Sequence, residues 1–149
     1  MRKIIFILTA MIICAITMEA QKVKHPSLLF TPQRVEAAKK MLKTDTVMQQ
    51  SWEHIKAIAD AQVEGRGDIM KLEYMALAYQ MTGDTRYADK MKRMLLATAK
   101  TKSWGNGEML ARRPAWRSEL QMAHRSFQVA VAYDAIYDRL TPSERKEIA

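Results

Sequence analysis

The side chains that could carry acid-base or metal chemistry are few and widely separated in this chain of 149 residues. Its three histidines, His25, His54 and His124, do not have the His-x-x-x-His spacing of a metal site, so we expect no metal ligand set. His25 belongs to an extended segment before Pro26, and His54 falls on an amphipathic helix. We expect a structural or solvated role for all three histidines. His124, in the polar first half of a later helix, is also a candidate for substrate contact.

Two carboxylates, Asp134 and Asp138, stand one helical turn apart. A pair of carboxylates is the usual acid-base machinery of a glycoside hydrolase. Here the pair belongs to a Tyr-Asp-x-x-Tyr-Asp pattern near the end of a predicted helix, where caps and local pairs are the more common role. We therefore assign no catalytic residue within the chain.

A long loop is predicted over residues 101–117, TKSWGNGEMLARRPAWR. Loops of this length are uncommon inside a compact domain unless they have a function. Trp104 and Trp116 offer flat apolar faces on which sugar rings stack, and Arg112 and Arg113 carry forked donors that suit carboxylate or sulfate. Alternatively, the tryptophans close the end of the core and the arginines are solvated. The candidate substrate-binding residues are Trp104, Arg112, Arg113, Trp116 and His124.

Residues 1–20 have the layout of a secretory signal peptide. A short basic stretch at Arg2 and Lys3 precedes a mostly apolar run over 4–16, and Ala20 before Gln21 is a small residue at a cleavage point. The apolar run is short for a bilayer span, so we expect no stable membrane anchor. The sequence thus predicts a signal peptide over 1–20, a domain over 21–149, and an exported protein that is periplasmic or extracellular.

Cleavage would remove Cys14, the one cysteine, and leave no disulfide or thiolate site. It would also lower the net charge from +8 to +7, because two of 24 basic and one of 16 acidic residues would be lost. This balance favours anionic partners. For an exported protein we expect an acidic polysaccharide and no nucleic acid, with a solvated lysine-rich face as the alternative. No cofactor is visible.

The remaining pattern is helical, with no strand signal. Helices are expected after Thr31-Pro32, over 46–63, over 69–81, over 85–100 and over 118–140, and a further one starts at a capping box in Thr141-Pro142-Ser143-Glu144. Thr82-Gly83-Asp84 supplies a C-terminal glycine and a new N-cap, which predicts a tight helix hairpin.

The faces of these helices predict their arrangement. The helices over 46–63 and 85–100 are amphipathic, whereas the helix over 69–81 and the second half of the helix over 118–140, from Val129 onward, present apolar side chains on every side. Two layers of helices, with the inner ones enclosed, would produce this alternation. A single four-helix bundle would make every helix amphipathic. We therefore expect an all-α fold of helical hairpins in two layers.

Several segments together resemble a known family. They are HPSLLFT at 25–31, LAYQMTGDTRY at 77–87, Trp104, and AVAYDAIYD at 130–138 followed by LTP at 140–142. In this order they are similar to the N-terminal half-toroid of the heparinase II/III-like polysaccharide lyases, relatives of certain alginate lyases. The resemblance covers nearly all of residues 25–149. Ala135 departs from it, since the family often carries tryptophan after Tyr-Asp.

The resemblance implies an incomplete (α/α) toroid followed by a β-sandwich domain. It also implies a secreted lyase that cleaves an acidic, uronic-acid-containing polysaccharide, such as a glycosaminoglycan or an alginate-like polymer, by β-elimination. The family's catalytic Asn or Glu, His and Tyr lie further along, so we expect the catalytic residues beyond residue 149 and regard the chain as truncated and inactive alone.

Two other classes of function remain open. A helical-repeat module for protein interaction should repeat near 34 residues, yet this spacing carries Tyr79 onto Arg113 in the predicted loop. An α/α-toroid glycoside hydrolase would need its carboxylates to point into the cleft.

Overall fold

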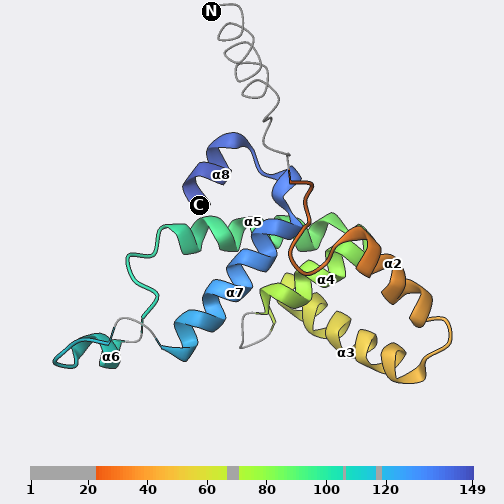
Figure 1. The fold of residues 1–149 in the computed structure, drawn as a ribbon, viewed down its shortest axis with the longest axis horizontal. Helices are drawn as coiled ribbons and strands as arrows, with labels where there is room; N and C mark the ends of the chain where they lie inside the picture. The colour runs from red at the N-terminus through yellow and green to blue at the C-terminus, as the bar shows by residue number, and fades with distance from the viewer. Residues whose placement is uncertain (1–22, 67–70, 106, 117–118) are drawn as a thin grey trace, which may run out of the picture.

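The computed structural model describes residues 23–66, 71–105, 107–116 and 119–149, and over these ranges it is helical without strands (Figure 1). The predicted signal peptide, residues 1–20, lies outside the described residues. The elements are α2 (Pro32–Met41), α3 (Thr46–Val63), α4 (Leu72–Thr82), α5 (Thr85–Ala99), α6 (Gly107–Ala111), α7 (Leu120–Ala135), the 3-10 helix η1 (Tyr137–Arg139) and α8 (Pro142–Ile148). The all-α prediction is confirmed for this part of the chain.

Local capping chemistry determines where the helices begin and end. The Thr31 side chain accepts a hydrogen bond from the Arg34 amide before α2, and Thr141 and Glu144 form the predicted capping box of α8. Gly83 ends α4 with φ +74°, a left-handed conformation that costs glycine little. Asp84 then caps α5 through the Arg86 amide. The predicted hairpin between α4 and α5 is confirmed.

Helix α4 lies at the centre of the fold and packs against α2, α3, α5 and α7. Its residues Leu72, Met75, Ala76 and Ala78 are fully buried. The continuous apolar pattern of this helix has a direct cause, because neighbouring helices exclude water from most of its sides. The prediction of an enclosed helix is confirmed here.

Helix α5 buries one face and exposes the other, as its sequence predicts. Tyr87, Met91 and Leu95 are buried against the core, whereas Arg93 is exposed. The Tyr87 hydroxyl donates to Asp60 Oδ1 of α3 at 2.5 Å. Burial, followed by this hydrogen bond, raises the pKa of Tyr87. The bond joins α5 to α3 through a buried ring.

Helix α7 is buried on one face only. Val131, Ala132 and Ala135 pack into the core, but Ala130 is exposed and Phe127 is 48% exposed. The prediction of a helix enclosed on every side is therefore wrong for α7. The physical reason is that α4 and α5, its main neighbours, cover a single face.

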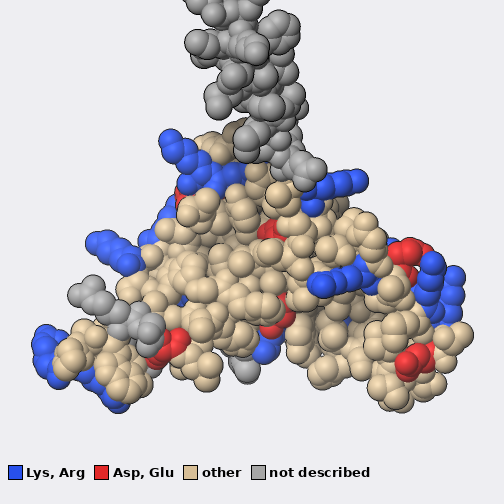
Figure 2. Space-filling model, in the orientation of Figure 1, with Lys and Arg blue, Asp and Glu red and all other residues tan. Residues whose placement is uncertain are grey.

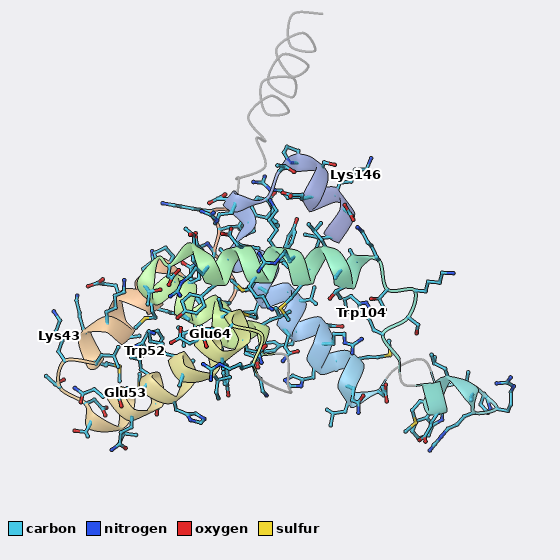
Figure 3. The ribbon with its side chains drawn as sticks, turned by 180° about the vertical axis from the view of Figure 1, so that it is seen from behind. Lys43, Trp52, Glu53, Glu64, Trp104 and Lys146 are labelled. Atoms are coloured by element: carbon cyan, nitrogen blue, oxygen red, sulfur yellow. The ribbon has the colours of Figure 1, made fainter. Side chains whose placement is uncertain are left out.

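The last helices differ in how they attach. Helix α8 is joined to α5 by an ion pair between Lys92 and Glu144 (2.6 Å). Helix α6 lies within the predicted loop, buries none of its residues and projects away from the other helices in both Figure 1 and Figure 3. None of the described helices has the length and apolarity needed to cross a bilayer.

Candidate functional site

Asp134, in the last turn of α7, is the centre of a hydrogen-bond cluster and is 4% exposed. Its carboxylate accepts from the Ser27 amide (2.9 and 3.0 Å), the Leu28 amide (2.9 Å) and the Ser27 hydroxyl (3.2 Å). It also contacts His25 Nδ1 at 2.6 Å. The segment 25–28 is thereby fixed to α7, more than 100 residues later in the chain. It bends at His25 and Pro26, which are joined by a cis peptide bond, so the prediction of an extended segment is wrong here.

These contacts keep Asp134 ionised. Burial alone raises the pKa of the carboxyl, but hydrogen bonds from Leu28, His25 and Ser27 outweigh burial and lower it. A carboxylate beside Nδ1 accepts a hydrogen bond, so Nδ1 of His25 carries the proton. The other imidazole nitrogen, Nε2, is then the one available to a ligand, as in sites where a carboxylate orients a histidine.

This imidazole is one of three planar groups that stack on one another. The His25 and Tyr137 rings are 3.9 Å apart between centroids and 23° from parallel. The guanidinium carbon of Arg145 lies 3.9 Å from the same Tyr137 centroid. Two groups at this distance cannot share one face, so they cover opposite faces of Tyr137. We call His25, Tyr137 and Arg145 the aromatic stack.

Two cavities meet at the aromatic stack. The larger, of about 510 Å³, is lined by the stack together with Val23, Lys24 and Asp138. The smaller, of about 270 Å³, shares His25, Tyr137 and Asp138 with the larger one and extends toward the hairpin between α4 and α5, where Tyr79 and Gly83 line it. We call the larger one the stack cavity.

The predicted loop residues fall into two separate groups. The guanidinium of Arg112 lies over the Trp116 ring, 4.3 Å from its centroid, and Trp116 is 51% exposed. Arg113 Nη1 donates to the carbonyl oxygens of Ala111 and Arg112, both at 3.0 Å. The structure thus brings together Arg112, Arg113 and Trp116, which we call the arginine–tryptophan cluster. Figure 2 shows Lys and Arg atoms near α6, with others scattered over the visible face.

Trp104 and His124 lie outside this cluster. Trp104 is half-buried where the chain leaves α5 (Figure 3) and lines an apolar cavity of about 200 Å³ with Val129 and Tyr133 of α7 and Ile148 of α8. His124 is exposed on α7. Of the five predicted residues, three lie together.

The carboxylate pair considered for glycoside hydrolysis has unequal members. Asp134 and Asp138 both line the smaller cavity. However, both oxygens of Asp134 accept hydrogen bonds from the segment 25–28, so neither is available to a substrate. Asp138 is exposed. The arrangement gives Asp134 a structural role, through long-range contacts and not through the local caps and pairs that the sequence predicts.

The contact between Asp134 and His25 was not predicted. One signal for it was present, since a carboxylate within the apolar run 129–140 has to find hydrogen-bond partners if the run is buried. The sequence does not identify the partners, because the contact spans 109 positions.

Neither a group of metal ligands among the described residues nor a known relative assigns a function to these sites. Within the described ranges, no three His, Cys, Asp or Glu side chains gather as a metal site requires. No model of a known protein family matches the chain, and no curated protein matches it. The functional argument therefore depends on the residue patterns and the geometry described above.

Proposed function

We propose that this chain is the N-terminal part of the toroid of a secreted polysaccharide lyase, which cleaves an acidic, uronic-acid-containing polymer by β-elimination. The helix contacts support the fold that this proposal needs. Enclosed α4 packs against α7, whereas the two amphipathic helices α3 and α5 contact each other. Two layers of helical hairpins place enclosed helices beside amphipathic ones, as α4 lies beside α3 and α5, although α7 leaves one face open to solvent.

The arginine–tryptophan cluster is the observation that carries the choice of ligand. Trp116 offers exposed aromatic surface for a sugar ring, and the Arg112 guanidinium supplies planar cationic donors beside it. Arg113, the next residue, adds a second guanidinium on the same exposed segment. An acidic sugar presents a ring face and a carboxylate together. A neutral sugar would leave the two guanidinium groups without a charged partner.

β-Elimination on a uronate requires three contributions. The carboxylate has to be neutralised, a base has to remove the C5 proton, and an acid has to protonate the departing glycosidic oxygen. We assign none of these roles to residues 23–149. In the proposal the arginine–tryptophan cluster binds and positions the polymer, and the residues that perform the chemistry belong to the rest of the lyase.

Binding to this cluster is tested with alginate, hyaluronan, chondroitin sulfate and heparan sulfate, with neutral dextran as the control polymer. Loss of a charge-assisted contact in R112A, and loss of the aromatic surface in W116A, each predict about tenfold weaker binding of at least one acidic polymer, measured by titration calorimetry. R93A is the matched control, because Arg93 is exposed on α5 and its loss changes the charge equally. Equal binding of dextran, or unchanged affinity in R112A and W116A, would contradict the proposed ligand class.

Cleavage is tested on the protein of the complete reading frame. β-Elimination leaves an unsaturated uronate that absorbs near the ultraviolet edge, so absorbance should rise with at least one of the four acidic polymers. Binding without any rise in absorbance would reject the lyase assignment and favour a binding or hydrolytic function.

A further inference from the structure

The aromatic stack is fixed at the atoms that face the protein. His25 is bound through Nδ1 to Asp134, and Arg145 is bound through Nε to the Tyr137 carbonyl at 3.1 Å. Within the described residues, neither Nε2 of His25 nor the two terminal nitrogens of Arg145 take part in a hydrogen bond. The stack therefore holds the Arg145 donors and the Nε2 acceptor of His25 in fixed positions before any ligand binds, which lowers the entropic cost of binding.

The charges around the stack cavity favour an anion. Lys24 and Arg145 contribute two positive charges, and Asp138 contributes one negative charge. Arg145 presents a planar fork that suits the two oxygens of a carboxylate. Lys24 adds a point charge; it is exposed on the segment 23–30 before α2, which we call the lead. His25 Nε2, which is an acceptor when Nδ1 carries the proton, is a contact for a hydroxyl group of the ligand.

The size and the mixed polarity of the cavity argue for more than a bare ion. A volume of about 510 Å³ lies within the ordinary range of small-molecule sites. Asp138 would repel a simple anion, but its oxygens accept hydrogen bonds from hydroxyl groups. A molecule with a carboxylate at one end and hydroxyls at the other satisfies both parts of the lining.

We propose that the stack cavity is a second binding site, which takes a carboxylate-bearing sugar with its carboxylate on Arg145 and Lys24 and its hydroxyls toward Asp138. The choice of a sugar acid rests on the proposed function, whereas the anion site follows from the geometry alone. The site is built from the lead, η1 and α8, and it shares no residue with the arginine–tryptophan cluster. A polymer bound at the cluster and a sugar bound at the stack can therefore be separated by mutation.

The test follows the ring-proton resonances of the three histidines of the full chain by NMR during titration with glucuronate, glucose and acetate. Glucuronate should shift the His25 resonances in a saturable manner and leave those of His54 and His124 unchanged. Glucose should have no effect, and acetate should require about tenfold higher concentration, because it lacks the hydroxyls that Asp138 accepts. An equal response to glucose would overturn the anion site, and an equal affinity for acetate would overturn the sugar ligand.

Two variants tie the response to the named residues. R145A should weaken glucuronate binding at least about tenfold, and K24A about threefold, whereas R93A should bind like the unmodified chain. If R145A does not fold, K24A decides, since Lys24 is exposed on the lead. Unchanged binding in the folded variants would overturn the stack site. Polymer binding that survives K24A and R145A but is lost in W116A would leave the proposed function intact, so the two failures can be told apart.

Discussion

At the scale of single residues, Asp134 links the two ends of the described chain. A buried carboxylate is costly unless it is hydrogen-bonded, and Asp134 meets this cost with donors from His25, Ser27 and Leu28. The same contacts orient His25 in the aromatic stack. This group of hydrogen bonds, which we call the tie, therefore both stabilises the fold and is required by the proposed second binding site.

Replacement of Asp134 by Asn should lower the free energy of unfolding at pH 7 by about 1–3 kcal/mol, because the amide nitrogen would face backbone donors and leave them unpaired. Urea denaturation measures this change. D138N is the matched control, since Asp138 is exposed, and it should stay within about 0.5 kcal/mol of the unmodified chain. Equal stability of the two variants would contradict the role of Asp134 as a tie.

The pH dependence of this tie has a definite sign. The pKa of Asp134 in the folded chain is lowered from its ordinary value of 3.8, despite burial, by its hydrogen bonds. Its contribution is therefore complete at pH values above the unfolded pKa and is lost as pH falls through the lower folded pKa. Urea midpoints measured from pH 7 downward should decline over this acidic window less steeply for D134N than for the unmodified chain. Parallel curves for the two proteins would contradict the assignment.

At the scale of elements, the sequence predicted those features that depend on residues close together along the chain. The capping box at Thr141 and Glu144 and the Gly83-Asp84 hairpin were predicted because each needs residues only a few positions apart. The open face of α7 was not predicted, since the exposure of Ala130 depends on which helices pack beside α7. Likewise, the sequence predicted Arg112 and Trp116 as candidates but could not separate them from Trp104, which lines a cavity with residues of α7 and α8.

The hairpin between α4 and α5 gives a test of backbone conformation alone. A Cβ at Gly83 would meet nothing within 4 Å, so G83A should be destabilising only through its φ of +74°. We expect a loss of about 1–2 kcal/mol in the free energy of unfolding, measured by thermal or urea denaturation. Gly107 is the control, because a Cβ there also meets nothing and its φ is not positive. A G107A loss as large as that of G83A would rule out the conformational explanation.

At the scale of the whole molecule, the residues of the hydrophobic core and those of the proposed binding cluster lie on different elements. Helices α4, α5 and α7 supply most of the core, whereas the arginine–tryptophan cluster lies on and beside α6, which buries no residue and projects from the other helices (Figure 1). A helix of five residues has little stability by itself in water. Within the described part of the loop, α6 thus contributes no buried side chain that would hold the loop to the core.

This separation predicts a gradient of hydrogen exchange. Amides of α4 and α5 should exchange most slowly because their side chains are buried, and those of α6 should exchange nearly as fast as an unstructured peptide. If the cluster binds an acidic polymer, alginate or another polymer that binds should slow exchange in α6, because a bound chain stabilises the folded form of the segment, while dextran should not. Exchange measured by mass spectrometry resolves these segments. Protection of α6 equal to that of α4 in the free protein would show that the loop is anchored by contacts other than its ends. An α6 unaffected by a polymer that does bind would move the binding surface away from Trp116, toward the lead and η1.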